Sequence, residues 1–95
     1  MGVLIEIPSA LKQYVNNQDV VEVDGSSVKE ALDSLCTQFN DLKPNLFDEN
    51  GRVRNFINVY LNDDDIRYAD GMNSVVNEGD SIQIVPSVAG GSENS

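Results

Sequence analysis

The chain contains no histidine and only one cysteine, Cys36, among its 95 residues. Histidine is the commonest general base and a frequent metal ligand in proteins. A single cysteine cannot form an internal disulfide, and no second cysteine is present to build a metal-binding knuckle. Hydrolytic or metal chemistry within this chain is therefore not expected, and we predict neither catalytic nor metal-ligating residues.

Long apolar runs are missing as well. No stretch approaches the ~18 consecutive apolar residues that indicate a membrane-spanning helix. The start, residues 1–6, lacks the basic region of a secretory signal peptide. The sequence therefore predicts a cytoplasmic protein that does not act at a membrane.

Basic residues are few. Six Lys and Arg stand against 16 Asp and Glu, which gives a net charge of −10. A surface with this charge repels nucleic acids and anionic membranes, so we expect neither as a partner. The charge is compatible with a partner that presents a basic surface, and equally with a surface that only provides solubility.

The N-terminal segment has the pattern of a β-hairpin with a wide connection. Residues 3–7 place apolar side chains on one face, as in a half-buried strand, and Pro8 closes this strand. Residues 9–17 indicate a loop or a short irregular link. Residues 20–23 predict a second strand that ends at Asp24-Gly25.

The clearest local signal is an amphipathic helix that begins after Ser27. Ser27 and Glu30 have the spacing of a capping box, in which each side chain satisfies a free backbone N–H group. One apolar stripe of about three turns follows. Its members are Val28, Ala31, Leu32, Leu35, Cys36 and Phe39. Because Cys36 belongs to this stripe, we predict a buried, inert thiol.

Short elements are expected after the helix. Residues 42–47, around Pro44, form an apolar connection that we expect to close one end of the core. Residues 56–61 alternate well and predict a central strand. A turn at residues 62–64 leads to a short return strand at residues 65–68. The consecutive aspartates of that turn lack the glycine and the distal glutamate of a calcium loop, so they indicate a solvated turn.

The last predicted strand comprises residues 81–85. A loop at residues 69–73 and a tight turn at residues 78–80 precede it. Pro86 has no N–H group to donate to a sheet, so pairing should stop there. Residues 87–95 contain only two apolar side chains, and we expect this tail to be mobile.

These elements predict one α+β domain, residues 1–86, followed by the tail, residues 87–95. The 40% hydrophobic content is enough for a single core in a chain of this size. A hairpin, one main helix over one face and a late strand beside the first strand give a two-layered structure. The pattern gives only the two layers; the strand order that makes this a mixed sheet of about five strands with a β-grasp, or ubiquitin-like, fold is what the family resemblance described below implies.

The tail contains the only candidate for chemistry, the pair Gly90-Gly91 after Val88-Ala89. Taken alone, a glycine pair is also typical of a flexible linker. A glycine pair directly after the last predicted strand is less common than a glycine pair in general. The rest of the sequence therefore decides between a linker and a functional motif.

The segment 56–68 resembles the one that proteins of the MoaD/ThiS family place before their last loop. The resemblance extends over nearly the whole chain, from residue 3 on. It is dense in the segments 71–72, 77–86 and 88–91. The Ile7-Pro8 opening and the segment 56–68 are most similar to the carriers of the cysteine-biosynthesis branch.

The resemblance implies a sulfur carrier that is not itself an enzyme and binds no cofactor. In this family an E1-like enzyme uses ATP to adenylate the C-terminal glycine, here Gly91, and sulfur then replaces AMP to leave a thiocarboxylate. A second enzyme, of the cysteine synthase-like kind in this branch, consumes the sulfur. Val88, Ala89 and Gly90 would thread into the partner enzymes. The physics agrees, because six residues from Pro86 to Gly91 can span about 20 Å and glycine passes where a side chain would clash.

One feature departs from the pattern. Residues 92–95 follow Gly91, so its carbonyl is an amide and offers no carboxylate to adenylate. Some family members are extended precursors that a metalloprotease of the JAMM type trims, which is the interpretation we favour. A cloning artefact and a carrier that has lost its role are the alternatives.

Other functions remain open at this stage. The small subunit of molybdopterin synthase and a ubiquitin-like protein modifier share the tail chemistry, while a plain acidic interaction module would need none. Exposed aromatic residues on the sheet, Phe56 and Tyr60, are candidates for docking, but we favour the interpretation that they only cover the edge of the core and do not include them in the predicted site. We expect the chain to be a monomer on its own.

Overall fold

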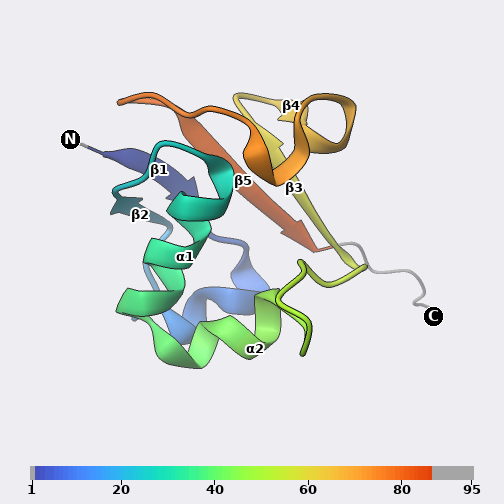
Figure 1. The fold of residues 1–95 in the computed structure, drawn as a ribbon. Helices are drawn as coiled ribbons and strands as arrows, with labels where there is room; N and C mark the ends of the chain where they lie inside the picture. Colours follow the sequence, from blue (N-terminus) through green and yellow to red (C-terminus); the bar gives the residue numbers. More distant parts are fainter. Residues whose placement is uncertain (1, 87–95) are drawn as a thin grey trace.

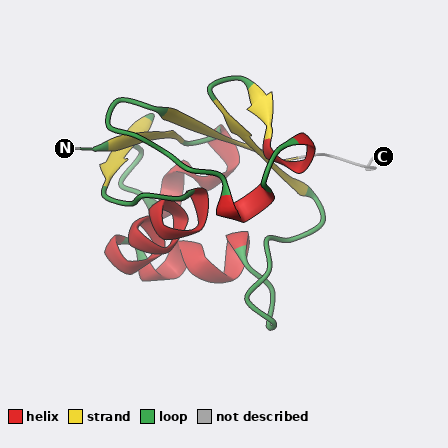
Figure 2. Cartoon of the chain, turned by 45° about the horizontal axis from the view of Figure 1, so that its top comes forward, coloured by secondary structure: helices red, strands yellow, loops and turns green. Residues whose placement is uncertain are grey.

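The computed structural model describes residues 2–86, which form a five-stranded mixed sheet with helices packed against one face (Figures 1 and 2). Met1 and the residues 87–95 lie outside the described part. The strands follow the order β2-β1-β5-β3-β4 across the sheet. They are β1 (Val3–Glu6), β2 (Val20–Val23), β3 (Ile57–Leu61), β4 (Asp64–Asp65) and β5 (Ser81–Pro86). The predicted α+β fold with one main helix is therefore confirmed.

The N-terminal hairpin is formed as predicted, but its connection is helical. β1 and β2 pair antiparallel, with Val3 opposite Val23. The segment Ser9–Tyr14, expected to be a loop, is a 3₁₀ helix, η1. The Leu11 N–H group donates to the Pro8 carbonyl over 2.9 Å. Burial of Leu11 in the core holds this turn in place, and that tertiary contact is not visible in the local sequence pattern.

β5 occupies the middle of the sheet. It runs parallel to β1 on one side, with Ile82 opposite Ile5, and antiparallel to β3 on the other. The sequence predicted residues 56–61 as a central strand. That prediction was wrong in one respect, because β3 is an inner strand between β5 and β4 and the middle position belongs to the more deeply buried β5.

The main helix, α1 (Val28–Gln38), begins as the sequence predicted. The Glu30 N–H group donates to Ser27 Oγ over 3.1 Å. The Glu30 carboxylate reaches one residue further back than in a capping box, and accepts from the N–H and hydroxyl groups of Ser26 at 2.9 and 2.8 Å. These hydrogen bonds favour the charged form and lower the pKa of Glu30.

The apolar stripe of α1 packs against the sheet. Val28, Ala31, Leu32, Leu35 and Cys36 are all buried in the core, while Phe39 is partly buried at the end of the helix. Residues 42–47 close one end of this core, as expected. They do so as two short helical turns, η2 (Asn40–Leu42) and α2 (Lys43–Leu46), which bury Leu42, Leu46 and Phe47.

The β3–β4 hairpin turns on Asn62 and Asp63, whose φ angles are 51° and 75°. Two consecutive left-handed residues are typical of the tight turn that suits the twist of a hairpin. The predicted return strand forms as β4, but its predicted bounds, residues 65–68, were wrong, because β4 ends at Asp65 and the chain turns into η3 (Ile66–Tyr68). The Asp65 carboxylate accepts from the Arg67 N–H group at 2.9 Å and binds the Arg67 guanidinium at 2.7 Å, which stabilises this turn.

The segment 69–73, expected to be a loop, contains one more short turn, η4 (Gly71–Asn73). None of the helices in the described residues has the length and apolar character needed to cross a membrane.

Candidate functional site

The predicted site residues Val88, Ala89, Gly90 and Gly91 lie outside the described residues. The structure instead describes the strand that leads to the predicted tail, β5, which ends at Pro86. Pro86 is in register with Ile57, the first residue of β3 (Figure 1). The described pairing of β5 with β3 therefore includes Pro86, and the predicted end of pairing at this residue lies at the limit of the described part.

The strand that leads to the tail is anchored along its length. A turn precedes β5, in which the Asp80 N–H group donates to the Asn77 carbonyl over 2.9 Å and Gly79 has a φ angle of 88°. Such a left-handed position favours glycine. Pairing with a neighbour on each side and the burial of Ile82 and Ile84 then fix the course of β5. The tail therefore begins from a rigid point of the fold.

The sheet face opposite α1 is open and partly apolar. Leu4, Val20 and Val85 point to this side and remain 39%, 43% and 40% exposed. Glu6 lies among them, and its carboxylate accepts from Ser81 Oγ at 3.0 Å and from Gln83 Nε2 at 3.3 Å. We call Leu4, Val20 and Val85 the open-face patch. It offers apolar contact area near the strand that leads to the tail.

The two aromatic residues considered as docking candidates, Phe56 and Tyr60, differ in burial and in their position relative to the sheet. Tyr60 is half-buried and lies in register with Gln83 of β5, whereas Phe56 precedes β3 and is half-exposed. The structure therefore brings Tyr60 next to β5 on the sheet, and leaves Phe56 at the turn before β3.

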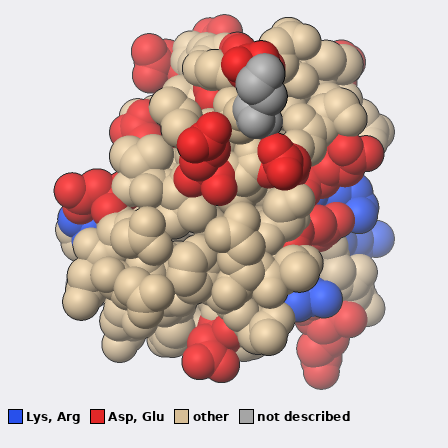
Figure 3. Space-filling view, turned by 90° about the vertical axis from the view of Figure 1, so that its left-hand side faces the viewer, with Lys and Arg blue, Asp and Glu red and all other residues tan. Residues whose placement is uncertain are grey.

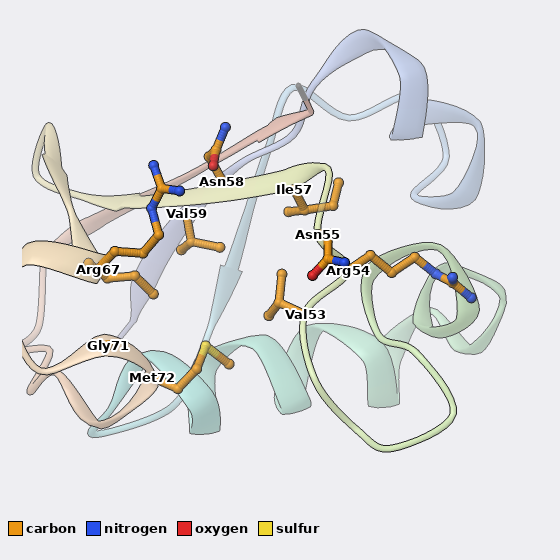
Figure 4. A pocket seen from close by; sticks show the side chains of 10 residues that line it. Val53, Arg54, Asn55, Ile57, Asn58, Val59, Arg67, Gly71 and Met72 are labelled. Carbon is orange, nitrogen blue, oxygen red and sulfur yellow. The ribbon is translucent and has the colours of Figure 1, made fainter. Parts of the chain in front are cut away.

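A cavity of about 300 Å³ lies beside the start of β3, next to the end of β5 (Figure 4). Ile57, Val59 and Ile66 form its buried apolar floor, and Val53 and Met72 face each other across it. No pattern in the sequence singled out this cavity. Its walls come from segments that only the folded topology brings together.

Two arginines border this cavity, and both are engaged within the protein. The guanidinium of Arg67 is held by Asp65, and Arg54 Nε donates to the Pro44 carbonyl over 2.7 Å. Figure 4 shows the Arg54 side chain extending away from the cavity, whereas the Arg67 guanidinium lies beside β3 near Asn58. The cavity is thus an apolar depression bordered by polar side chains, among them Asn55, which lies between Ile57 and Val53 in Figure 4.

The thiol of Cys36 does not form a reactive site. Its residue is only 4% exposed, and burial raises its pKa to about 11, with a smaller contribution from the nearby Asp33 carboxylate. The thiolate is the nucleophilic form of cysteine, so this side chain is protonated and unreactive near neutral pH. The predicted buried, inert thiol is confirmed.

The charged groups of the described chain act mainly on local structure. The Asp48 carboxylate accepts from the backbone N–H groups of Arg52 and Asn50, which lowers its pKa, and Arg67 does the same for Asp65. Within residues 2–86, no group of three or more His, Cys, Asp or Glu side chains could hold a metal ion. Carboxylates clearly outnumber basic side chains on the end of the molecule that carries the N-terminus (Figure 3).

The comparisons with known proteins point in one direction. The model of the ThiS family matches residues 5–91, which include the glycine pair of the tail. The sulfur carrier protein CysO of Mycobacterium tuberculosis is 31% identical over 93 residues, which cover 96% of this chain and all of that protein. The small archaeal modifier protein 3 of Haloferax volcanii is 34% identical over 68 residues, 72% of this chain and 73% of that protein.

A solved structure shares the fold at similar identity. The crystal structure of the Amycolatopsis orientalis BexX/CysO complex contains a chain that matches with a TM-score of 0.85 and 36% identity, over 94% of this chain and 99% of that one. The ubiquitin-like fold predicted from the sequence is therefore shared along nearly the whole length.

Proposed function

The chain belongs to the ThiS family, and on that premise we propose that it is a sulfur carrier whose Gly91 receives sulfur as a thiocarboxylate. The observation that carries this proposal is the extent of the family match, which runs from the first strand through Gly90-Gly91. The chain itself supplies the carboxylate and its presentation. Catalysis belongs to partner enzymes, and no bound cofactor is required on the carrier.

The chemistry requires an activated carboxylate. An E1-like enzyme would let the Gly91 carboxylate attack the α-phosphorus of ATP, which releases pyrophosphate and forms an acyl adenylate. Hydrosulfide, or a persulfide that a thiol later reduces, then attacks the carbonyl carbon. The new C–S bond replaces the C–O bond to AMP, and a thiocarboxylate remains.

The fold supports this role through the position at which the tail starts. The six residues from Pro86 to Gly91 can span about 20 Å when fully extended. Val88 and Ala89 are small, and Gly90 and Gly91 have no side chain, so the segment suits a narrow catalytic channel. Because the end of β5 is rigid, binding of the domain to an enzyme would fix the point from which the tail extends toward the catalytic site.

The residues 92–95 must be removed before this reaction. We infer that a metalloprotease of the JAMM type cleaves after Gly91, because only that cleavage creates a free carboxylate at the second glycine. Without it, the Gly91 carbonyl stays in an amide bond to Ser92 and offers no nucleophilic oxygen for ATP.

The open-face patch is the surface that we assign to the activating enzyme. Leu4, Val20 and Val85 give it apolar area, and Val85 directly precedes the residue at which the tail starts. The CysO chain in the Amycolatopsis orientalis structure is in a complex with BexX. This supports the proposal that a similar carrier binds a partner protein. We also propose that this exchange takes place in the cytoplasm, where ATP is available to the activating enzyme.

The decisive experiment compares two lengths of the chain. Protein that ends at Gly91 and protein that ends at Ser95 are incubated with the E1-like enzyme, ATP and a sulfur donor, and intact mass is measured. The shorter chain should gain the mass difference between sulfur and oxygen, and the longer chain should not change. ATP–pyrophosphate exchange provides a second readout of the adenylation step.

A control identifies the position of the sulfur. A chain that ends at Gly90 retains a terminal glycine but lacks the full length, so it should be activated poorly. Equal modification of the chains that end at Gly91 and at Ser95 would contradict the proposal, because sulfur would then have entered at another site.

Protein modification is a second candidate function, favoured by the similarity to the small archaeal modifier protein 3. In this alternative, a lysine amine of a target protein attacks the Gly91 adenylate or thioester and forms an amide bond. Epitope-tagged protein that ends at Gly91 would then appear in larger conjugates in native cells. Conjugates that form with this chain but not with a chain that lacks Gly91 would support this function. If neither chain forms conjugates, the carrier role would be the remaining proposal.

A further inference from the structure

A second cavity, of about 290 Å³, lies beside the β3–β4 hairpin, at the opposite end of β3 from Ile57. Its apolar wall is formed by Leu61, Ile66 and Val75. Val75 is 66% exposed, which is unusual for a large apolar side chain in this domain. The cavity lies at the lower limit of pockets that bind small ligands, so it suits a group of side-chain size.

Two carboxylates border the same cavity. Asp64 and Asp70 both line it, and neither forms an ion pair within the part of the chain that the structure describes. The neighbouring Asp65 differs, because it is occupied by the guanidinium of Arg67. The cavity therefore presents an apolar wall and two carboxylates that have no ion-pair partner among the described residues.

Ser74 provides an independent observation. It lines this cavity, is only 5% exposed, and its hydroxyl group has no hydrogen-bond partner among the described residues. Its backbone is fixed, since its carbonyl accepts from the N–H group of Val28, the first residue of α1, and its own N–H group donates to the Gly71 carbonyl, both over 3.0 Å. A buried hydroxyl without a partner is costly, so a ligand that supplies a donor would stabilise this arrangement.

We propose that the cavity binds the guanidinium group of an arginine side chain from a partner protein. The aliphatic stem of the arginine would pack against the apolar wall, and its planar head would donate to the two carboxylates and the serine hydroxyl. Arginine has five N–H donors in a fixed fork and is weakly hydrated, which fits several acceptors in a half-buried site. The net charge of −10 attracts a partner with such a basic side chain.

Other cations fit less well. A hydrated metal ion gains nothing from the apolar wall, and the described residues provide no group of three or more metal-ligating side chains. A lysine ammonium group has only three donors on a compact head, so it cannot bridge several separated acceptors as the planar guanidinium group of arginine can. The arginine site lies at the opposite end of β3 from the start of the tail and shares no lining residue with the open-face patch, so it would add a contact that neither of them supplies.

The ligand itself can be varied in the first test. Acetyl-Val-Arg-Val-amide is titrated into the ¹⁵N-labelled full-length chain, and the amide shifts of residues 61–75 are followed by NMR. The matched control replaces arginine with citrulline, which has the same shape but carries a urea in place of the charged guanidinium. We expect shifts around the cavity and binding at least about fivefold weaker for citrulline, because charge-assisted hydrogen bonds are lost. Equal affinities for the two peptides would overturn the proposal.

Variants of the protein provide the second test. Asp64→Asn and Asp70→Asn should each weaken binding of the arginine peptide about threefold or more, since each removes one charged acceptor. Asp63→Asn is the matched control, because it changes the net charge equally and asparagine tolerates the left-handed backbone at this position. Its effect should be smaller than twofold, as expected for a screened charge outside the cavity. A loss with Asp63→Asn as large as with Asp64→Asn would mean that only the overall charge matters.

Ser74→Ala distinguishes binding from a structural role. It removes a buried hydroxyl group without a partner, so the free protein should melt at a higher temperature, while its affinity for the arginine peptide should fall. A variant that is more stable and binds with unchanged affinity would contradict the proposed contact. A lysine peptide that binds as tightly as the arginine peptide would equally overturn the assignment to guanidinium.

Discussion

Cys36 shows at the scale of a single residue how burial controls chemistry. Its pKa is raised from 9.0 to about 11, first by burial and second by the charge of Asp33. We predict that a thiol reagent does not modify the native protein at pH 8, that the reaction begins as the pH approaches 11, and that urea exposes the thiol at once. Rapid modification of folded protein at pH 8 would show that the helix stripe is open at this position.

The same shift makes stability depend on pH in the alkaline range. Because the folded pKa of Cys36 is raised, the thiol contributes its full stability below the unfolded value near 9, and this contribution is lost as the pH rises toward about 11. Denaturant melts measured between pH 9 and pH 11 should show a free energy of unfolding that falls as the pH rises. A Cys36→Ala variant should lose less over the same interval, although it is less stable at neutral pH because it leaves a small cavity.

Carboxylates act in the opposite direction. Backbone and side-chain hydrogen bonds lower the pKa of Glu30, Asp48 and Asp65 in the folded protein. Their contribution is therefore complete above the ordinary values of 4.5 for Glu and 3.8 for Asp, and is lost as the pH falls through the lower folded values. Melting temperatures measured from pH 6 down to 2 should fall, and Glu30→Gln should reduce the slope. An unchanged slope would mean that the Ser26 hydrogen bonds are not formed in solution.

At the scale of elements, we predict that stability depends on α1 and not on the tail. Leu35 is completely buried on the apolar stripe, so Leu35→Ala should cost about 2–5 kcal/mol by leaving a cavity. A chain that ends at Pro86 should differ from the full chain by less than about 1 kcal/mol, because residues 87–95 offer only two apolar side chains. Denaturant melts of both variants provide the comparison. If the truncation cost as much as Leu35→Ala, the domain would extend beyond residue 86.

The elements also show which parts of the fold could be predicted from the sequence. Strands with clear alternation and the helix with its cap were recognisable, because a period of two or of 3.6 residues and the Ser27–Glu30 spacing are local signals. The turns η1 and η3 were not. They depend on the burial of Leu11 and Ile66 in a core built from distant strands, and that information is absent from a window of neighbouring residues.

For the molecule as a whole, the two kinds of candidate site differ in how they are encoded. The glycine pair of the tail is a linear motif, so the sequence could indicate it without a structure. The cavities could not be predicted, because Val53 and Met72, or Leu61 and Ser74, meet only through the sheet order and the path from β4 to β5. Their residue types are ordinary for core edges and turns, and no spacing distinguishes them.

The pathway that receives the sulfur is a property of the whole molecule and its partners. We propose a route to cysteine, because Ile7-Pro8 and residues 56–68 resemble the carriers of the cysteine-biosynthesis branch. In that route, the thiocarboxylate sulfur of Gly91 attacks an O-activated serine derivative and expels its leaving group. The amine of the new residue then attacks the thioester carbonyl, and acyl transfer from sulfur to nitrogen leaves cysteine joined to Gly91 by an amide bond. A protease of the JAMM type would release the amino acid and restore the carboxylate.

Intact mass measured over time tests this route. Thiocarboxylated carrier that ends at Gly91 is incubated with native-cell extract and O-activated serine. We expect a transient species that is heavier than the carboxylate form by one cysteine residue, followed by return to the carboxylate. Extract treated with a zinc chelator should accumulate the adduct, because a metalloprotease needs its metal ion. A molybdopterin donor would return directly to the carboxylate, so loss of sulfur with no cysteinyl species, accompanied by a dithiolene pterin, would assign the chain to that pathway instead.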